Sequence, residues 1–89
     1  MPRFYFDLHN DVDSIDDEGK DLPDLSAAKA NAAREVRELV SAGVMEHGKV
    51  DLRHYIQVRD EAGADVLRVH FEDAVTVTRG NDVLSRPLA

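Results

Sequence analysis

Five carboxylates lie within eight residues near the start of the sequence: Asp11, Asp13, Asp16, Asp17 and Glu18. Hard cations such as Ca²⁺ and Mg²⁺ bind several carboxylate oxygens at once, so this segment could form a divalent-cation site. The EF-hand pattern is not met, because with Asp11 as the first ligand Ile15 stands at the fifth position and Asp16 replaces the required glycine. The other interpretation is a solvated segment that places negative charge near a helix N-terminus.

Histidines offer a second possible metal site. Alternation along the first and third predicted strands places two histidines and two acids on the outer sheet face: His9, His70, Asp7 and Glu72. If these strands are neighbours, the four side chains could converge on zinc or another divalent ion. The alternative is cross-strand pairing of exposed histidines with acids. We interpret His47 and His54 as structural, because they lie at a helix end and near a strand end.

Nucleophiles and phosphate-binding motifs give no support for catalysis. The chain has no cysteine, and its serines fall in loop, cap, helix-surface and tail contexts: Ser14, Ser26, Ser41 and Ser85. None of them lies in a Gly-x-Ser-x-Gly turn, and no glycine-rich phosphate loop is present. We therefore predict neither enzymatic activity nor a cofactor.

The charge of the chain is negative and unevenly distributed. The net charge is −7, and residues 1–24 hold eight acids and two bases, a net charge of −6. Nucleic-acid-binding proteins usually carry a basic stripe, and this acidic segment would oppose phosphate contacts. We therefore expect no nucleic-acid partner.

The length and the apolar content bound the class of protein. A chain of 89 residues is expected to form one domain that buries about 60% of its unfolded surface, and such small domains often gain stability by self-association. No stretch approaches a membrane span, and the N-terminal residues do not follow a signal pattern. The lack of cysteine fits a reducing compartment. We expect a cytoplasmic protein with no membrane partner.

A long amphipathic helix is predicted for residues 25–47, and the other elements are organised around it. Its apolar positions fall on one stripe of the helical wheel: Leu25, Ala28, Ala32, Val36, Leu39 and Gly43. Asp24 is the expected N-cap, with Ser26 as the alternative. Gly48, following His47, is the preferred C-terminal stop, with Gly43 as the alternative.

Three main strands are predicted around the helix, at residues 2–9, 53–60 and 65–72. Each shows the alternation of apolar and polar residues that is typical of a half-buried strand. Gly63 closes a short hairpin loop between the last two strands, and Gly19 ends a turn within the acidic segment. Residues 10–24 are long for an irregular loop, so we expect local pairing there.

The order of these elements predicts an α+β fold, a two-layer β-α-β-β unit with one long helix on a three-stranded, mostly antiparallel sheet. A right-handed crossover would make the first and second main strands parallel, with the third strand between them. The domain is expected to cover residues 1–75. Residues 76–89 are expected to form an extension that is a short strand or a flexible tail.

The sheet face opposite the helix has no predicted cover. The expected interface residues on this face are Tyr5, Tyr55, Val66 and Arg68. Tyrosine and arginine are enriched at the centres of protein interfaces, and Val66 is expected on the same face. An open face beside a free edge strand favours pairing with a second copy. The alternative is an ordinary solvated face, which antiparallel sheets tolerate.

Several short motifs, in this order and at this spacing, resemble a known family: Met1-Pro2-Arg3-Phe4-Tyr5-Phe6, Asp17-Glu18-Gly19, Leu22-Pro23-Asp24-Leu25, Asp60-Glu61-Ala62-Gly63 and Phe71-Glu72-Asp73-Ala74. Over residues 1–75 the chain resembles the small bacterial family named domain of unknown function 6894. The resemblance implies the fold and carries no activity with it.

The sequence therefore predicts a small non-catalytic interaction module. We expect it to be a homodimer that associates through the open sheet face or edge. A further expectation is an unidentified protein partner, for which a basic protein attracted by the acidic segment is a candidate. The alternative function is a divalent-cation-binding protein that uses residues 11–18.

Overall fold

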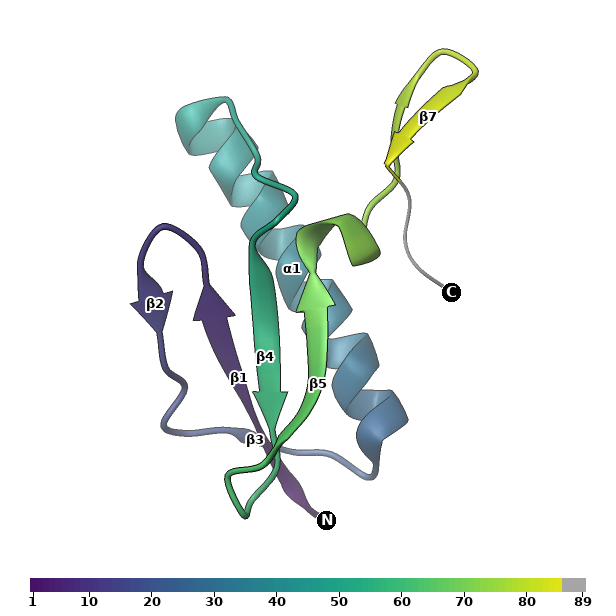
Figure 1. The fold of residues 1–89 in the computed structure, drawn as a ribbon. Coiled ribbons are helices and arrows are strands. Elements are labelled where there is room, and N and C mark those ends of the chain that lie inside the picture. Colours follow the sequence, from purple (N-terminus) through teal and green to yellow (C-terminus); the bar gives the residue numbers. More distant parts are fainter. Residues whose placement is uncertain (86–89) are drawn as a thin grey trace.

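The computed structural model describes residues 1–85 and shows an α+β fold with one α-helix and two antiparallel sheets (Figure 1). The elements are β1 (Arg3–His9), β2 (Asp13–Ser14), β3 (Lys20–Asp21), α1 (Leu25–His47), β4 (Tyr55–Arg59), β5 (Asp65–His70), the 3₁₀ helix η1 (Phe71–Asp73), β6 (Val77–Arg79) and β7 (Asp82–Ser85). No helix among the described residues is long and apolar enough to cross a membrane.

The main sheet has the strand order β2-β1-β4-β5, and all its pairings are antiparallel. The predicted parallel arrangement of the first two main strands, with the third between them, is wrong. β1 pairs directly with β4, from Tyr5 opposite Arg59 to His9 opposite Tyr55, and β5 lies at the edge. The order changes which side chains are neighbours on the open face.

The path of the acidic segment explains the antiparallel order. β2 pairs with the end of β1, whereas β3 pairs with its start, and the N–H of Leu22 donates to the carbonyl of Pro2 (3.0 Å). The chain therefore returns along β1 before the helix begins. Helix α1 then carries it to the far end of the sheet, where β4 must run back against β1. The crossover rule assumes that the helix follows the strand end without this return.

Helix α1 begins and ends where its local sequence indicates. The Asp24 carboxylate accepts a hydrogen bond from the N–H of Ala27 (2.8 Å), as an N-cap does. Gly48 adopts a left-handed conformation (φ 67°), and its N–H donates to the carbonyl of Val44. The predicted bounds of residues 25–47 are confirmed, and Asp24 rather than Ser26 is the cap.

The core lies between α1 and the inner sheet face. Its buried apolar side chains come from the helix, from β1, β4 and β5, and from the turn that follows: Phe4, Phe6, Ala28, Ala32, Val36, Ile56, Val58, Val69, Phe71 and Ala74. The predicted helix stripe differs at its start, because Leu25 is exposed and Asn31 is buried. The helix packs on β4, β5 and η1, and Figure 1 shows β1 and β2 to the side of it.

A separate hairpin follows the main domain. β6 and β7 pair with each other in a two-stranded sheet that projects beyond η1 (Figure 1). Val83 and Leu84 on β7 are exposed. The predicted extension over residues 76–89 contains this hairpin, and residues 86–89 lie outside the described part of the chain.

Candidate interaction surface

Asp7 is the buried centre of a hydrogen-bond network on the outer side of the sheet. The Arg59 guanidinium donates to both carboxylate oxygens, through Nε to Oδ2 (2.6 Å) and Nη2 to Oδ1 (3.1 Å). The N–H of Asp16 also donates to Asp7 Oδ1 (2.9 Å), and Arg59 Nη2 donates to the carbonyl of Asp16 (3.0 Å). These contacts attach residues 10–24, which we call the returning segment, to β1 and β4.

The Asp16 side chain completes the same network. Its Oδ2 accepts from the N–H of Phe6 (3.0 Å), and its Oδ1 accepts from the N–H groups of Glu18 (3.0 Å) and Gly19 (3.1 Å). Gly19, which the sequence predicted to end this turn, has a positive φ of 72°. Both carboxylate oxygens are therefore engaged with the backbone, which identifies Asp16 as a turn-forming residue.

Two opposing effects act on the pKa values of these carboxyls. Burial raises the pKa of Asp7, but the hydrogen bonds from Arg59 and the Asp16 N–H outweigh it and hold the pKa below 3.8. Burial likewise raises the pKa of Asp16, and three backbone N–H donors outweigh it. Both groups are ionised at neutral pH, where their charges hold the loop in place.

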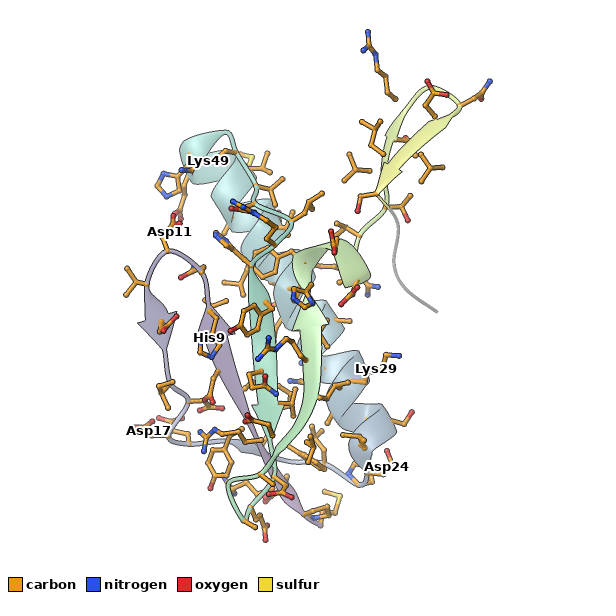
Figure 2. All side chains as sticks on the ribbon, viewed as in Figure 1. His9, Asp11, Asp17, Asp24, Lys29 and Lys49 are labelled. Atoms are coloured by element: carbon orange, nitrogen blue, oxygen red, sulfur yellow. The ribbon has the colours of Figure 1, made fainter. Side chains whose placement is uncertain are left out.

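The other acids of the predicted cation site point in different directions. Asp13 Oδ1 lies 3.1 Å from His9 Nδ1. Asp11 stands at the tip of the β1–β2 turn, and its Oδ1 lies 3.6 Å from His54 Nε2 (Figure 2). Asp17 and Glu18 are exposed, with Asp17 at the outer bend of the segment (Figure 2). Within residues 1–85 no group of three or more histidine, aspartate or glutamate side chains is placed to hold a metal ion.

The predicted pairing of His9 with His70 is altered by the strand order. Tyr55 on β4 lies between them, opposite His9 on one side and His70 on the other. The Tyr55 ring stacks on His9 with centroids 4.7 Å apart and an interplanar angle of 18°, and its centroid lies 5.3 Å from that of His70. Two of the four residues predicted as a metal site, His9 and His70, therefore form an aromatic row with Tyr55 across three strands. The other two lie elsewhere, because Asp7 is bound to Arg59 and Glu72 lies on η1.

Arg68 extends this row on β5. Its guanidinium carbon lies 4.2 Å from the centroid of the Tyr55 ring, a cation–π contact, and its Nε donates to Gln57 Oε1 (2.9 Å). Gln57 is buried, and its Nε2 donates to the carbonyl of Leu67 (2.8 Å). A buried amide and an aromatic ring thus hold an exposed guanidinium in one orientation.

The four predicted interface residues do not form one cluster on the open face. Tyr55 and Arg68 are in contact, whereas Tyr5 lies at the other end of the face beneath Arg59, 5.0 Å from ring centroid to guanidinium. Val66 is half-buried and packs against the core, beside an irregularity in the β4–β5 register. The sequence pattern did not predict the roles of Gln57 and Arg59, because only the strand register shows which side chains are their neighbours.

Comparison with known families gives one match. The model of the domain of unknown function (DUF6894) matches residues 3–72. The chain belongs to this family. The match covers the main sheet, α1 and most of η1, and ends before the β6–β7 hairpin. No curated protein and no solved structure matches the chain. Membership in DUF6894 therefore supports the domain but implies no activity, so a functional proposal has to rest on the surface residues described above.

Proposed function

We propose that this chain is a small cytoplasmic, non-catalytic interaction module that forms a homodimer through the β5 edge and the adjoining open face. The observation that carries the proposal is the order of charges on β5. Asp65 stands at the start of the strand, whereas Arg68 and His70 lie toward its end. Both Asp65 and Arg68 are exposed.

The charge order on β5 is relevant to dimerisation because β5 lies at the edge of the sheet. In the described sheet β5 has a strand neighbour on one side, β4. An exposed edge strand offers backbone groups to another strand, and two identical strands related by a two-fold axis pair in antiparallel orientation. Antiparallel pairing brings the acidic start of each β5 beside the basic end of the other, and opposite charges across strands stabilise such pairs.

The orientation of Arg68 supports the same surface. Among residues 1–85 no carboxylate forms an ion pair with Arg68, whereas Arg59 is paired with Asp7. Because Gln57 and Tyr55 already restrict the Arg68 side chain, little rotamer freedom remains to be lost when it binds. A carboxylate such as Asp65 of a second copy matches the fork of a guanidinium.

The perturbed acids support a structural role rather than catalysis. The pKa values of Asp7 and Asp16 are lowered by contacts that use their oxygens to attach the returning segment to the sheet. A general base needs a lone pair directed at a substrate and a pKa nearer the working pH. These two carboxylates instead stabilise the fold, because they connect the returning segment with β1 and β4.

Charge exchange at the edge tests the dimer. We would measure the molar mass by light scattering during size-exclusion chromatography for the wild type, Asp65→Arg, Arg68→Asp and the double variant. Each single change places like charges together and should give a monomer, whereas the double variant restores opposite charges and should recover the dimer mass. Asp17→Arg and Arg34→Asp make the same charge changes elsewhere and should remain dimeric.

Three results contradict the proposal. A wild-type chain that stays monomeric at high concentration has no such interface. Single variants that keep the dimer mass show that β5 is not at the contact. A double variant that stays monomeric, with an unchanged circular dichroism spectrum, shows that Asp65 and Arg68 do not face each other across the two-fold axis.

A further inference from the structure

A groove runs along the side of α1, next to β1 and the segment that returns from it. It consists of three adjoining hollows with volumes of about 310, 310 and 610 Å³. The first two share Phe6, Leu8 and Glu35, and the largest hollow shares Leu39 with one of them. The groove therefore extends from Glu35 to the C-terminal end of the helix.

The position of the helix creates this groove. Helix α1 packs on β4, β5 and η1, so the inner face of β1 is covered only along one side. Leu8 on β1 and Leu39 on α1 are half-buried on opposite walls, with the buried Phe6 and Ile56 between them. The apolar face of the sheet is thus wider than the helix that covers it.

Large apolar side chains remain exposed at the groove. Ile15 is 64% exposed, and it lines the groove from the returning segment. Val50 is 40% exposed and lines the largest hollow near the end of the helix. Exposed apolar residues around a groove, bordered by polar ones, are typical of protein-interaction sites.

The border of the groove is mainly acidic at the two smaller hollows, whereas at the largest hollow two acids are accompanied by Lys49 and Arg53. Glu35 and Glu38 line it from the helix, Glu18 from the returning segment, and Asp11 and Asp51 near the helix end. Hydrogen bonds from Arg53 lower the pKa of Asp51 to about 2, so this carboxyl is ionised at neutral pH. Some of these charges are balanced, since Lys20 lies 3.3 Å from Glu35 and Arg53 pairs with Asp51. Glu38 lies at a longer distance of 4.0 Å from Arg34, and Asp11 lies 3.6 Å from His54.

We propose that this groove binds a segment of another protein that combines apolar side chains with lysine or arginine. The apolar floor would take its leucine-like side chains, and the carboxylates of Glu38, Glu18 and Asp11 would lie beside its basic side chains. The groove borders β1, whereas the proposed dimer uses β5 at the opposite edge of the sheet. One copy can therefore hold both partners at once, and the groove does not depend on the dimer.

A second copy of this chain suits the groove less well. The exposed apolar residues of the β6–β7 hairpin, Val83 and Leu84, are accompanied by one base and one acid, Arg79 and Asp82. The chain also carries a net charge of −7, which opposes its approach to an acidic border. A basic apolar segment meets neither obstacle.

A synthetic peptide provides the probe. We would titrate the full chain against a fluorescein-labelled peptide of alternating leucine and lysine and measure fluorescence anisotropy. Two control peptides replace leucine by serine or lysine by glutamate. The first peptide should bind more tightly than either control, because the groove needs both the apolar and the basic side chains.

Matched variants locate the binding. Ile15→Asn should weaken binding about tenfold, as expected for the lost burial of one isoleucine side chain. Val83→Asn changes an exposed apolar residue on the hairpin and should leave the Kd unchanged. Glu38→Arg should also weaken binding, whereas Glu72→Arg, which makes the same charge change on η1, should not. Circular dichroism spectra of all four variants should match the wild type.

Several results overturn the proposal. A serine–lysine peptide that binds as tightly as the leucine–lysine peptide shows attraction by charge alone. Equal Kd values for Ile15→Asn and Val83→Asn place the binding outside the groove, and absence of binding removes it. If Ile15→Asn instead lowers the molar mass of the free protein, a second copy occupies the groove.

Discussion

Arg59 and Asp7 form a buried, two-point ion pair that joins β4 to β1, with Nε–Oδ2 and Nη2–Oδ1 distances of 2.6 and 3.1 Å. Asp7 is 3% exposed, although it lies on the sheet face that the helix does not cover. The returning segment covers it, because the backbone of Asp16 bonds to both members of the pair. The returning segment therefore covers the sheet face around Asp7, whereas the part of the face around Arg68 stays exposed.

Replacing Asp7 by Asn should destabilise the fold by about 2 kcal/mol, because the charge-assisted hydrogen bonds from Arg59 are weakened while its guanidinium remains partly buried. Urea unfolding followed by circular dichroism measures the change. Asp17→Asn removes an exposed carboxylate from the same segment and should leave the free energy of unfolding unchanged. Equal destabilisation by both variants would show that the network does not contribute specifically.

The stability of the protein should fall in acid. The pKa values of Asp7 and Asp16 in the folded protein lie below their ordinary value of 3.8, so the unfolded chain takes up protons first as the pH decreases. Their contribution is complete above pH 3.8 and is lost as the pH falls through the folded-state pKa values. The difference in unfolding free energy between wild type and Asp7→Asn should therefore narrow below pH 3.8. A constant difference down to the lowest accessible pH contradicts this assignment.

Gly19 should tolerate substitution less well than Gly63. Both have a positive φ, 72° and 86°, but a Cβ at Gly19 would lie 2.8 Å from the carbonyl oxygen of Phe4, whereas a Cβ at Gly63 meets nothing within 4 Å. Gly63→Ala should cost about 1 kcal/mol from the left-handed conformation alone. Gly19→Ala should cost about 2 to 4 kcal/mol, because the clash adds to that conformational cost. Thermal and urea unfolding of the two variants give the comparison, and equal losses would contradict the close packing of the turn on β1.

Added calcium or magnesium should leave the melting temperature unchanged relative to a chelator. Asp16 already uses both oxygens for backbone N–H groups, and Asp11 and Asp13 lie beside different histidines. A rise in melting temperature that disappears in an Asp11→Asn, Asp13→Asn variant would instead identify residues 11–18 as a cation site. Differential scanning fluorimetry with each ion is sufficient for this test.

Local chemistry was enough to predict the helix and the turns. Asp24 and Gly48 set the ends of α1 because capping depends on residues within one turn of the helix. Gly19 and Gly63 marked positive φ because other residues rarely adopt it. Alternation also placed Ile56, Val58 and Val69 on the inner face, where they are buried, since side-chain direction in a strand follows from parity alone.

The tertiary structure decided which strands are neighbours, and with them the composition of the surfaces. The order β1-β4-β5 depends on the return of residues 10–24 along β1, which Asp16 fixes through contacts with distant backbone groups. Helix α1 packs on β4 and β5 rather than on β1. In this position Asn31 is buried, Leu25 is exposed, and a groove remains beside β1. Sequence alone determined the main helix, the three main strands and most of their buried faces, because those depend on nearby residues. Strand order and helix position depend on contacts between residues far apart in the chain, and only the folded structure specifies them.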